Sequence, residues 1–203
     1  RRQLAWIVFL LPYLEESALA DRLSTQHAYG SERNRAAGGT PLPLFLCPTT
    51  ARTSRVGRTT GDRNQNGQWD PGEDLAYTDY GGLYGVSFPV PRILPEHEGV
   101  LIYERPIRSR EVLDGLTHTA MVGECTGRDV PHAAEWINGQ NIFDQTHNRP
   151  INYSQYDELW SDHPGGAQLG YCDGHAGFVS EDIDQAVLLA SLTRRGKEVP
   201  SWR

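Results

Sequence analysis

The stretch HPGGAQLGYCDGHAGFV, residues 163–179, decides the fold because its turn residues and its strand residues agree. Asp173 and Gly174 separate two short runs with strand character, residues 167–172 and 175–179. An Asp-Gly pair is typical of a two-residue type I′ turn, which requires positive φ at both central positions. We therefore predict a β-hairpin with Asp173 and Gly174 at its tip.

The residues before this hairpin predict a tight entrance. Pro164 fixes φ, while Gly165 and Gly166 permit backbone angles that are closed to other residues. A histidine beside such a turn is more often a hydrogen-bonded brace than a catalyst. We therefore expect that replacing His163 lowers stability rather than any turnover.

A helix is expected directly after the hairpin. Ser180 is the expected N-cap, and the acidic residues that follow it suit the positive end of the helix dipole. Apolar residues recur at helical spacing through residues 181–195, and Gly196 is the expected C′ residue. Residues 163–195 are thus predicted to form a hairpin followed by a C-terminal helix.

The composition predicts an α+β fold with long loops. The chain has 203 residues, of which 38% are hydrophobic, and its 21 Gly and 13 Pro favour short strands joined by turns. The formal net charge is −7 and Lys197 is the only lysine, so there is no basic patch of the kind that binds nucleic acid. The acidity suits cation binding better.

The N-terminal region, residues 1–27, predicts a core helix rather than a membrane span. Residues 4–11 are continuously apolar, but this run is about half the ~20 residues needed to cross a bilayer. Pro12 can start a helix that continues to Leu23. The chain begins at Arg1 without a starting Met, and we expect its natural N-terminus to lie upstream.

The rest of the chain predicts short strands between two long loops, all within a single domain. The loops cover residues 49–79 and 139–158, and the second could be a binding surface or a solvated excursion. Further strands are predicted at residues 42–47, 100–103, 119–124 and 134–137. The expected fold is a small antiparallel sheet with an N-terminal helix packed on it and a C-terminal helix.

One loop carries a metal-binding pattern. Residues 62–73, DRNQNGQWDPGE, match D-x-[DN]-x-[DN]-G-x5-E, in which oxygen ligands recur at alternate positions and a glycine allows the sharp turn. Oxygen ligands at this spacing indicate calcium rather than magnesium, which prefers a smaller octahedral shell. The flanks lack amphipathic helices, so we expect a structural ion rather than a sensor. The expected ligands are Asp62, Asn64, Asn66, Gln68, Asp70 and Glu73.

The cysteines do not indicate a structural zinc site. Cys47, Cys125 and Cys172 show no C-x-x-C spacing, and three cysteines form at most one disulfide within the chain. Which pair would form it stays open. The sequon Asn152-Tyr153-Ser154 is too short a pattern to indicate glycosylation.

Several stretches together resemble a large bacterial family of pilin-like proteins of unknown function. His163 followed nine residues later by Asp173-Gly174 resembles the H-x9-D-G signature of that family. The agreement extends over nearly the whole chain, in order, through WIVFLLPYLEESALADRL, PLFLCP, TDYGGLYG, EVLDGLTHTAMVGE and SEDIDQAVLLASLTRRGKEV. Leu116, His118 and Tyr171-Cys172 depart from the family's usual residues, which weakens a catalytic role for that region but not the fold assignment.

The resemblance implies a function in assembly. In that family a prepilin-type N-terminal segment is cleaved and methylated, and a hydrophobic helix anchors the protein in the inner membrane before it packs into a filament. The chain would then be the extracytoplasmic head of a pilin-like or pseudopilin-like subunit of a type IV pilus or type II secretion apparatus. It would self-assemble, or bind other pilin-like subunits, through the upstream helix, which would also be its only contact with the membrane.

Two other functions compete with this expectation. The first is an anchored binding module that uses residues 139–157 for a glycan or protein. The second is a hydrolase built from His163, Asp173, His175 and Asp114, but the chain has no G-x-S-x-G or H-E-x-x-H motif and no evidently activated nucleophile. We therefore expect no enzymatic activity.

Overall fold

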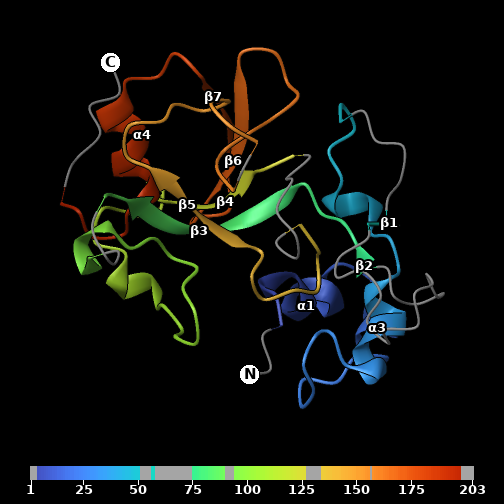
Figure 1. The fold of residues 1–203 in the computed structure, drawn as a ribbon. Coiled ribbons are helices and arrows are strands. Elements are labelled where there is room, and N and C mark those ends of the chain that lie inside the picture. Colours follow the sequence, from blue (N-terminus) through green and yellow to red (C-terminus); the bar gives the residue numbers. More distant parts are fainter. Residues whose placement is uncertain are drawn as a thin grey trace. The chain divides into compact units, whose positions relative to one another are not determined.

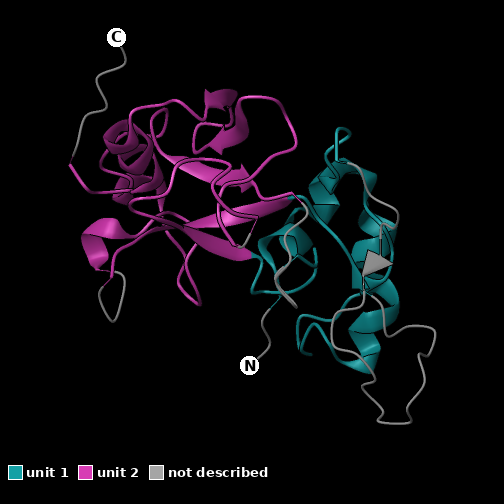
Figure 2. Ribbon diagram, turned by 45° about the horizontal axis from the view of Figure 1, so that its top comes forward, with its two compact units in different colours: residues 1–79, 129–141 teal, residues 80–128, 142–203 magenta. Residues whose placement is uncertain are grey.

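The computed structural model describes residues 4–50, 56–57, 75–89, 94–126, 134–155 and 157–197. The chain divides into two compact units, which Figure 2 shows in different colours. Unit 1 comprises residues 1–79 and 129–141, and unit 2 comprises residues 80–128 and 142–203. The single domain expected from the sequence stays a prediction.

Unit 2 is built on a five-stranded sheet (Figure 1). The strand order is β5-β3-β4-β6-β7, and every neighbouring pair is antiparallel except β3 and β5, which are parallel. With the helices of both units this confirms the predicted α+β class. The strands are β3 (Tyr80–Ser87), β4 (Ala120–Glu124), β5 (Ile142–Thr146), β6 (Gly166–Tyr171) and β7 (Ala176–Ser180).

Two of these strands were not predicted. No strand was predicted where β3 lies, and a loop was predicted where β5 lies. Glycine normally weakens a strand, but in β3 it permits close packing, because a Cβ at Gly82 would lie 2.7 Å from Leu101 Cδ1. The residues of β5 are alternately half-buried and buried, as in a strand with one face on a core.

The predicted strand at residues 100–103 is wrong. Gly99 and Leu101 each donate a backbone hydrogen bond to β3, at 2.6 and 3.2 Å, but no ladder continues from them. The contact coincides with an irregularity in β3, where the pairing with β5 shifts between Leu83 and Gly85 and Gly85 has a φ of +137°. The bulge therefore ends the pairing before a strand forms.

The hairpin is confirmed, but its turn differs from the predicted type I′. Asp173 does not have a positive φ, whereas Gly174 does, at +94°. The N–H of Gly174 donates to Tyr171 O at 3.0 Å, and that of Tyr171 donates to His175 O at 2.9 Å. The loop therefore has three residues, and the left-handed glycine at its end avoids a positive φ at Asp173.

Helix α4 (Gln185–Leu192) packs on the sheet and is shorter than predicted. Its N-cap is Asp184 rather than Ser180, because the Asp184 carboxylate accepts from the N–H groups of Ala186 and Val187 at 2.8 and 3.3 Å. Its end is not at Gly196, because Thr193 is already extended. Its apolar face joins the core of unit 2, which includes Leu83, Phe143, Leu169, Leu188 and Leu192.

Arg194 explains why α4 stops. Its backbone N–H donates to Glu98 O at 3.1 Å, and its carbonyl accepts from the N–H of Leu113 at 2.6 Å. Its buried guanidinium pairs with the Glu98 carboxylate and donates to Gly99 O at 2.7 Å. Together with the extended backbone of Thr193, these bonds hold residue 194 in a bend outside the helix.

Unit 1 contains short helices and a two-stranded sheet. The predicted helix from Pro12 to Leu23 is interrupted, because Pro12 has no N–H to donate and Glu15 has a φ of +62°. The elements are α1 (Trp6–Leu10), α2 (Ser17–Ala20), α3 (Glu32–Gly38), the 3-10 helices η1 (Leu11–Tyr13) and η2 (Pro43–Phe45), and the strands β1 (Val56–Gly57) and β2 (Leu75–Ala76). Packing of the N-terminal helix on the five-stranded sheet stays a prediction.

Two strands predicted in unit 1 are wrong. Residues 42–47 contain η2, and the N–H of Cys47 donates to Asp79 Oδ2 at 2.8 Å instead of to a neighbouring strand. Residues 134–137 contribute only an isolated bridge, between Glu135 and Tyr77, because turns flank it. Both segments nevertheless contribute to the core, since Phe45 and Trp136 are buried.

Unit 2 also contains two 3-10 helices between β3 and β4, η3 (Pro95–His97) and η4 (Ser109–Glu111). No helix of the described residues is long and apolar enough to cross a membrane.

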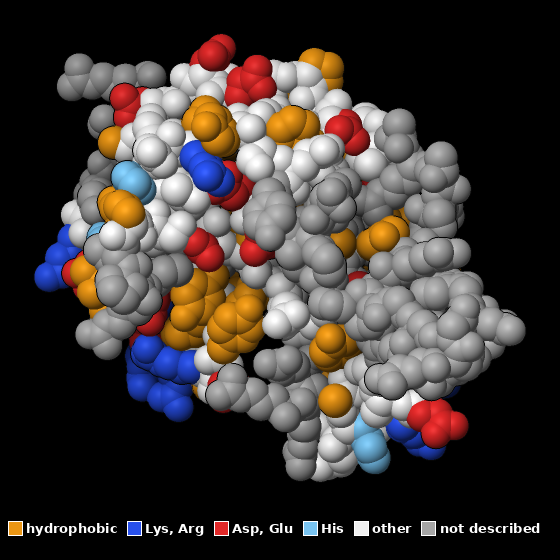
Figure 3. All heavy atoms as spheres, in the orientation of Figure 1, with side chains coloured by type: hydrophobic (Ala, Val, Ile, Leu, Met, Phe, Trp, Pro, Cys, Tyr) orange, Lys and Arg blue, Asp and Glu red, His pale blue; other side chains and the backbone are white. Residues whose placement is uncertain are grey.

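Hydrophobic side chains also reach the surface, as one face of the molecule shows in Figure 3. In unit 2 the large exposed ones are Tyr103, Leu113, Tyr153 and Phe178. Single exposed apolar residues are ordinary on protein surfaces. Phe178 differs from the others because it lies in β7, at the edge of the sheet.

We predict that Arg194→Met destabilises the chain by about 3 kcal/mol, because it leaves Glu98 without its buried partner. Urea unfolding measures the change. The matched control is Arg195→Met, next in sequence, which removes a half-buried guanidinium that donates to Pro95 O at 3.0 Å and should cost only about 1 kcal/mol. Equal effects of the two substitutions would contradict the role given to the buried pair.

Candidate functional site

The candidate site is built on Glu124, the last residue of β4. Glu124 is completely buried, although it is acidic. Its carbonyl accepts from the N–H of Trp160 at 3.1 Å, and the N–H of Thr126 donates to Trp160 O at 3.0 Å. These bonds place the chain from Leu159 to Ser161 beside the end of β4 and lead it toward His163.

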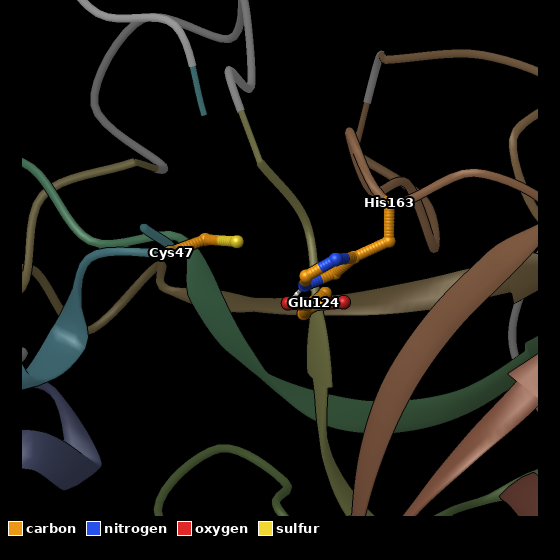
Figure 4. Close-up of side chains that lie close together, drawn as sticks. All are labelled: Cys47, Glu124 and His163. Carbon is orange, nitrogen blue, oxygen red and sulfur yellow. Dashed lines mark ion pairs between the residues drawn. The ribbon is translucent and has the colours of Figure 1, made fainter. Parts of the chain in front are cut away.

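The Glu124 carboxylate contacts two parts of the hairpin, of which Figure 4 shows the His163 side chain. Oε2 accepts from the backbone N–H of Gln168, in β6, at 2.7 Å. Oε1 lies 3.4 Å from Nε2 of the His163 ring. The backbone N–H of His163 donates to Ser161 Oγ at 3.1 Å. The carboxylate thus holds both the entrance and the first strand of the hairpin.

Burial sets the chemistry of this pair. A buried carboxylate is costly unless its oxygens have hydrogen-bond donors or opposite charges nearby. Here the backbone N–H of Gln168 donates to Oε2, whereas Oε1 has no hydrogen bond and only the His163 imidazole 3.4 Å away. The imidazole is one-quarter exposed, at 25% of its side-chain area, whereas the carboxylate is not exposed at all. The arrangement can pass a proton between solvent and the buried acid, and it can brace the hairpin. As metal ligands, these two groups alone are fewer than the roughly three or four that hold zinc in proteins.

The glycines of the predicted motif are needed for their backbone geometry. Gly165 has a φ of +80°, and its carbonyl accepts from the N–H of Glu181 at 2.9 Å. A Cβ at Gly166 would lie 2.1 Å from Val179 O, so no larger residue fits there without a shift of backbone. Both positions therefore require glycine.

Asp173 serves the tip of the hairpin. Its carboxylate accepts from the N–H of His175 at 3.1 Å and lies 2.6 Å from Nδ1 of the same residue. The backbone hydrogen bond, together with the side-chain bond, lowers the pKa of Asp173 below its usual range. The His175 ring stacks on Tyr171 at 4.3 Å between centroids. His163 and Asp173, the ends of the H-x9-D-G motif, thus flank β6 and bind different partners.

Of the four residues weighed for a hydrolase, Asp173 and His175 contact each other, whereas His163 and Asp114 bind other partners. His163 pairs with Glu124, and Asp173 pairs with His175. Asp114 accepts instead from the N–H groups of Gly196 and Lys197, at 2.7 and 2.8 Å. Each group therefore fixes a separate part of unit 2.

None of the three cysteines forms a disulfide, and Cys47 and Cys125 are buried. Burial raises the pKa of the Cys172 thiol to about 11, with a further contribution from the Asp173 carboxylate. At neutral pH this thiol is protonated and a poor nucleophile. The structure therefore gives Cys172 no activation for covalent chemistry.

The glycosylation sequon is explained by structure. Asn152 has a φ of +64°, its Oδ1 accepts from the N–H of Ser161 at 2.8 Å, and its Nδ2 donates to Glu181 at 2.9 Å. Asparagine tolerates this left-handed conformation better than most residues. Both of these side-chain hydrogen bonds of Asn152 therefore hold residues 152–161, the segment before the hairpin, in place.

The predicted calcium ligands lie outside the described residues. This holds for Asp62, Asn64, Asn66, Gln68, Asp70 and Glu73. The calcium site stays a prediction.

Sequence reasoning missed Glu124 as a site residue. The signal was an acidic residue at the end of a predicted strand, followed at once by Cys125, which is also buried. An acidic residue between a strand and a buried cysteine is itself expected to be buried, and a buried carboxylate needs a polar partner within the fold.

Comparison with known protein families places the chain. A family model described as "Protein of unknown function (DUF1559)" matches residues 1–186. The chain belongs to this family. Searches of curated proteins and of solved structures return no significant match for it. The DUF1559 match spans both units and ends within α4.

We predict that His163→Ala destabilises this DUF1559 chain by about 1–3 kcal/mol, because the buried Oε1 of Glu124 loses the imidazole nitrogen that lies 3.4 Å from it. His163→Gln, which keeps a donor, should recover part of the loss. Chemical unfolding measures both. The control is His175→Ala, where the imidazole is about half exposed and the loss should be smaller. A larger loss from His175→Ala would contradict the brace.

Proposed function

We propose that the chain is the globular head of a non-enzymatic, pilin-like or pseudopilin-like subunit with a structural or assembly role. The observation that carries the proposal is that four ionisable side chains of unit 2 bind other parts of the same chain. Glu124, His163, Asp173 and Asp114 each bond to the backbone or to a neighbouring side chain that fixes the fold. Membership of DUF1559 and the ordered sequence resemblance to pilin-like proteins support the same role.

The proposal includes location and partners. The head would lie outside the cytoplasm, in the periplasm or at the cell surface, and an upstream apolar helix would anchor its precursor in the inner membrane. The same helix would contact other pilin-like subunits of a type IV pilus or type II secretion apparatus. Nucleic acid is not a proposed partner, because the charge of −7 repels phosphates.

The first test is processing of the precursor. The gene with its natural upstream sequence would be expressed in cells with and without a prepilin peptidase. We predict a membrane-bound precursor that is shortened and N-methylated only when the peptidase is present, as measured by intact-protein mass spectrometry of the membrane fraction. Release by an ordinary signal peptidase, independent of the prepilin peptidase, would contradict the assignment.

We also propose that calcium orders residues 62–73, with Asp62, Asn64, Asn66, Gln68, Asp70 and Glu73 as its ligands. The support is the spacing of oxygen donors around Gly67. An ion bound only by the folded chain adds its binding free energy to the stability. A structural ion of this kind suits a medium rich in calcium, outside the cytoplasm.

We predict that calcium raises the melting temperature and that chelation lowers it. Asp62→Ala with Glu73→Ala should abolish the response. Differential scanning calorimetry with and without calcium measures it. The control is Glu96→Ala with Asp182→Ala, which removes the same formal charge from two exposed sites. A melting temperature that ignores calcium in the unaltered protein would contradict an ordered ion.

A further inference from the structure

Strand β7 lies at the edge of the five-stranded sheet. Among the described residues, its only strand neighbour in that sheet is β6. Its register with β6 places Ala167 opposite Val179 and Leu169 opposite Gly177. The hydrogen bond from Tyr171 N to His175 O, and that from Glu181 N to Gly165 O, show which pairs are bonded. Because bonded and non-bonded pairs alternate along an antiparallel ladder, the backbone N–H groups of the intervening β7 residues point away from β6. These residues are Ala176, Phe178 and Ser180.

This edge lacks the usual protection against pairing. Natural edge strands carry charges, prolines or strong bulges, and β7, AGFVS, has neither charge nor proline and keeps a regular register. Ala176, Phe178 and Ser180 are all exposed, and Phe178 is exposed to 50%. The Phe178 ring reaches over Gly166, where an added Cβ would lie 2.9 Å from Cζ.

We propose that two copies of this chain pair through β7, antiparallel, about a two-fold axis at Phe178. The two sheets would then form one continuous sheet, because the outward backbone groups of each β7 would bond those of the other. Phe178 would face Phe178 of the second copy, and Ala176 would face Ser180. The inference is independent of the proposed pilin-like role, which concerns the upstream helix.

The charges around β7 are compatible with a second copy of the chain as the occupant, because the chain can pair with itself here without opposing two acids. In this register His175 lies opposite Glu181, and Asp182 lies opposite Gly174, so no two acids face each other. A slip of two residues would place Asp173 opposite Glu181. Like charges directly opposite one another destabilise a strand pair. The charges flanking β7 therefore admit the register about Phe178 and disfavour the register about Gly177.

Disulfide trapping tests the register. In a Cys172→Ser background, where Cys47 and Cys125 are buried, Phe178→Cys would place two thiols on residues about 5.5 Å apart between Cα atoms, within disulfide range. Ser180→Cys is the matched control, because residue 180 of the two copies would be separated by roughly 13 Å along the strands. We expect a covalent dimer from the first variant and not from the second. Equal trapping of both, or of neither, would overturn the proposal.

Sedimentation of the unaltered protein over a range of concentrations tests the pairing itself. We expect a reversible dimer that Phe178→Lys abolishes and Leu113→Lys preserves, since Leu113 is also exposed but lies outside the sheet. Thermal unfolding of both variants checks that they fold. A folded Phe178→Lys variant that dimerises like the unaltered protein would overturn the proposal. So would trapping of residue 178 on a segment other than β7, identified by mass spectrometry.

Discussion

The buried carboxylate of Glu124 is the constraint on which the sheet of unit 2 depends. It sits at the end of β4 and binds the backbone of β6 through Gln168 and the hairpin entrance through His163. A buried carboxylate is costly without such partners, so the segments that supply them are held in place. The hairpin, with glycines where its backbone needs them, is thereby fixed to the middle of the sheet.

A second buried charged side chain, that of Arg194, also fixes connections in unit 2. Arg194 is buried, pairs with Glu98 and bonds the backbone near it, so that the chain leaving α4 is joined to the segment between β3 and β4. Arg105 extends this contact to Glu111, 2.6 Å away. Short strands joined by long loops bury little apolar surface for each ordered residue. Hydrogen bonds and ion pairs therefore have to fix the loops. Ionisable residues in this unit therefore serve the fold first.

Local features could be predicted from the sequence, and non-local ones could not. The hairpin, β4 and the existence of α4 follow from turn residues and periodicity close by in the chain. Strand β3 was hidden by its glycines, and β5 pairs in parallel with a strand more than fifty residues away. In the site, the roles of His163 and the glycines were predictable, whereas Glu124 was not, because its partners meet only in the folded chain.

The most direct test of the central role of Glu124 is native-state hydrogen exchange of the Gln168 amide, which donates to its carboxylate. If the carboxylate holds β6, this amide exchanges as slowly as the ladder amides of Leu169 and its neighbours, and Glu124→Ala accelerates it while the fold persists. An amide that exchanges rapidly in the unaltered protein, or one that Glu124→Ala leaves equally protected, would contradict the account.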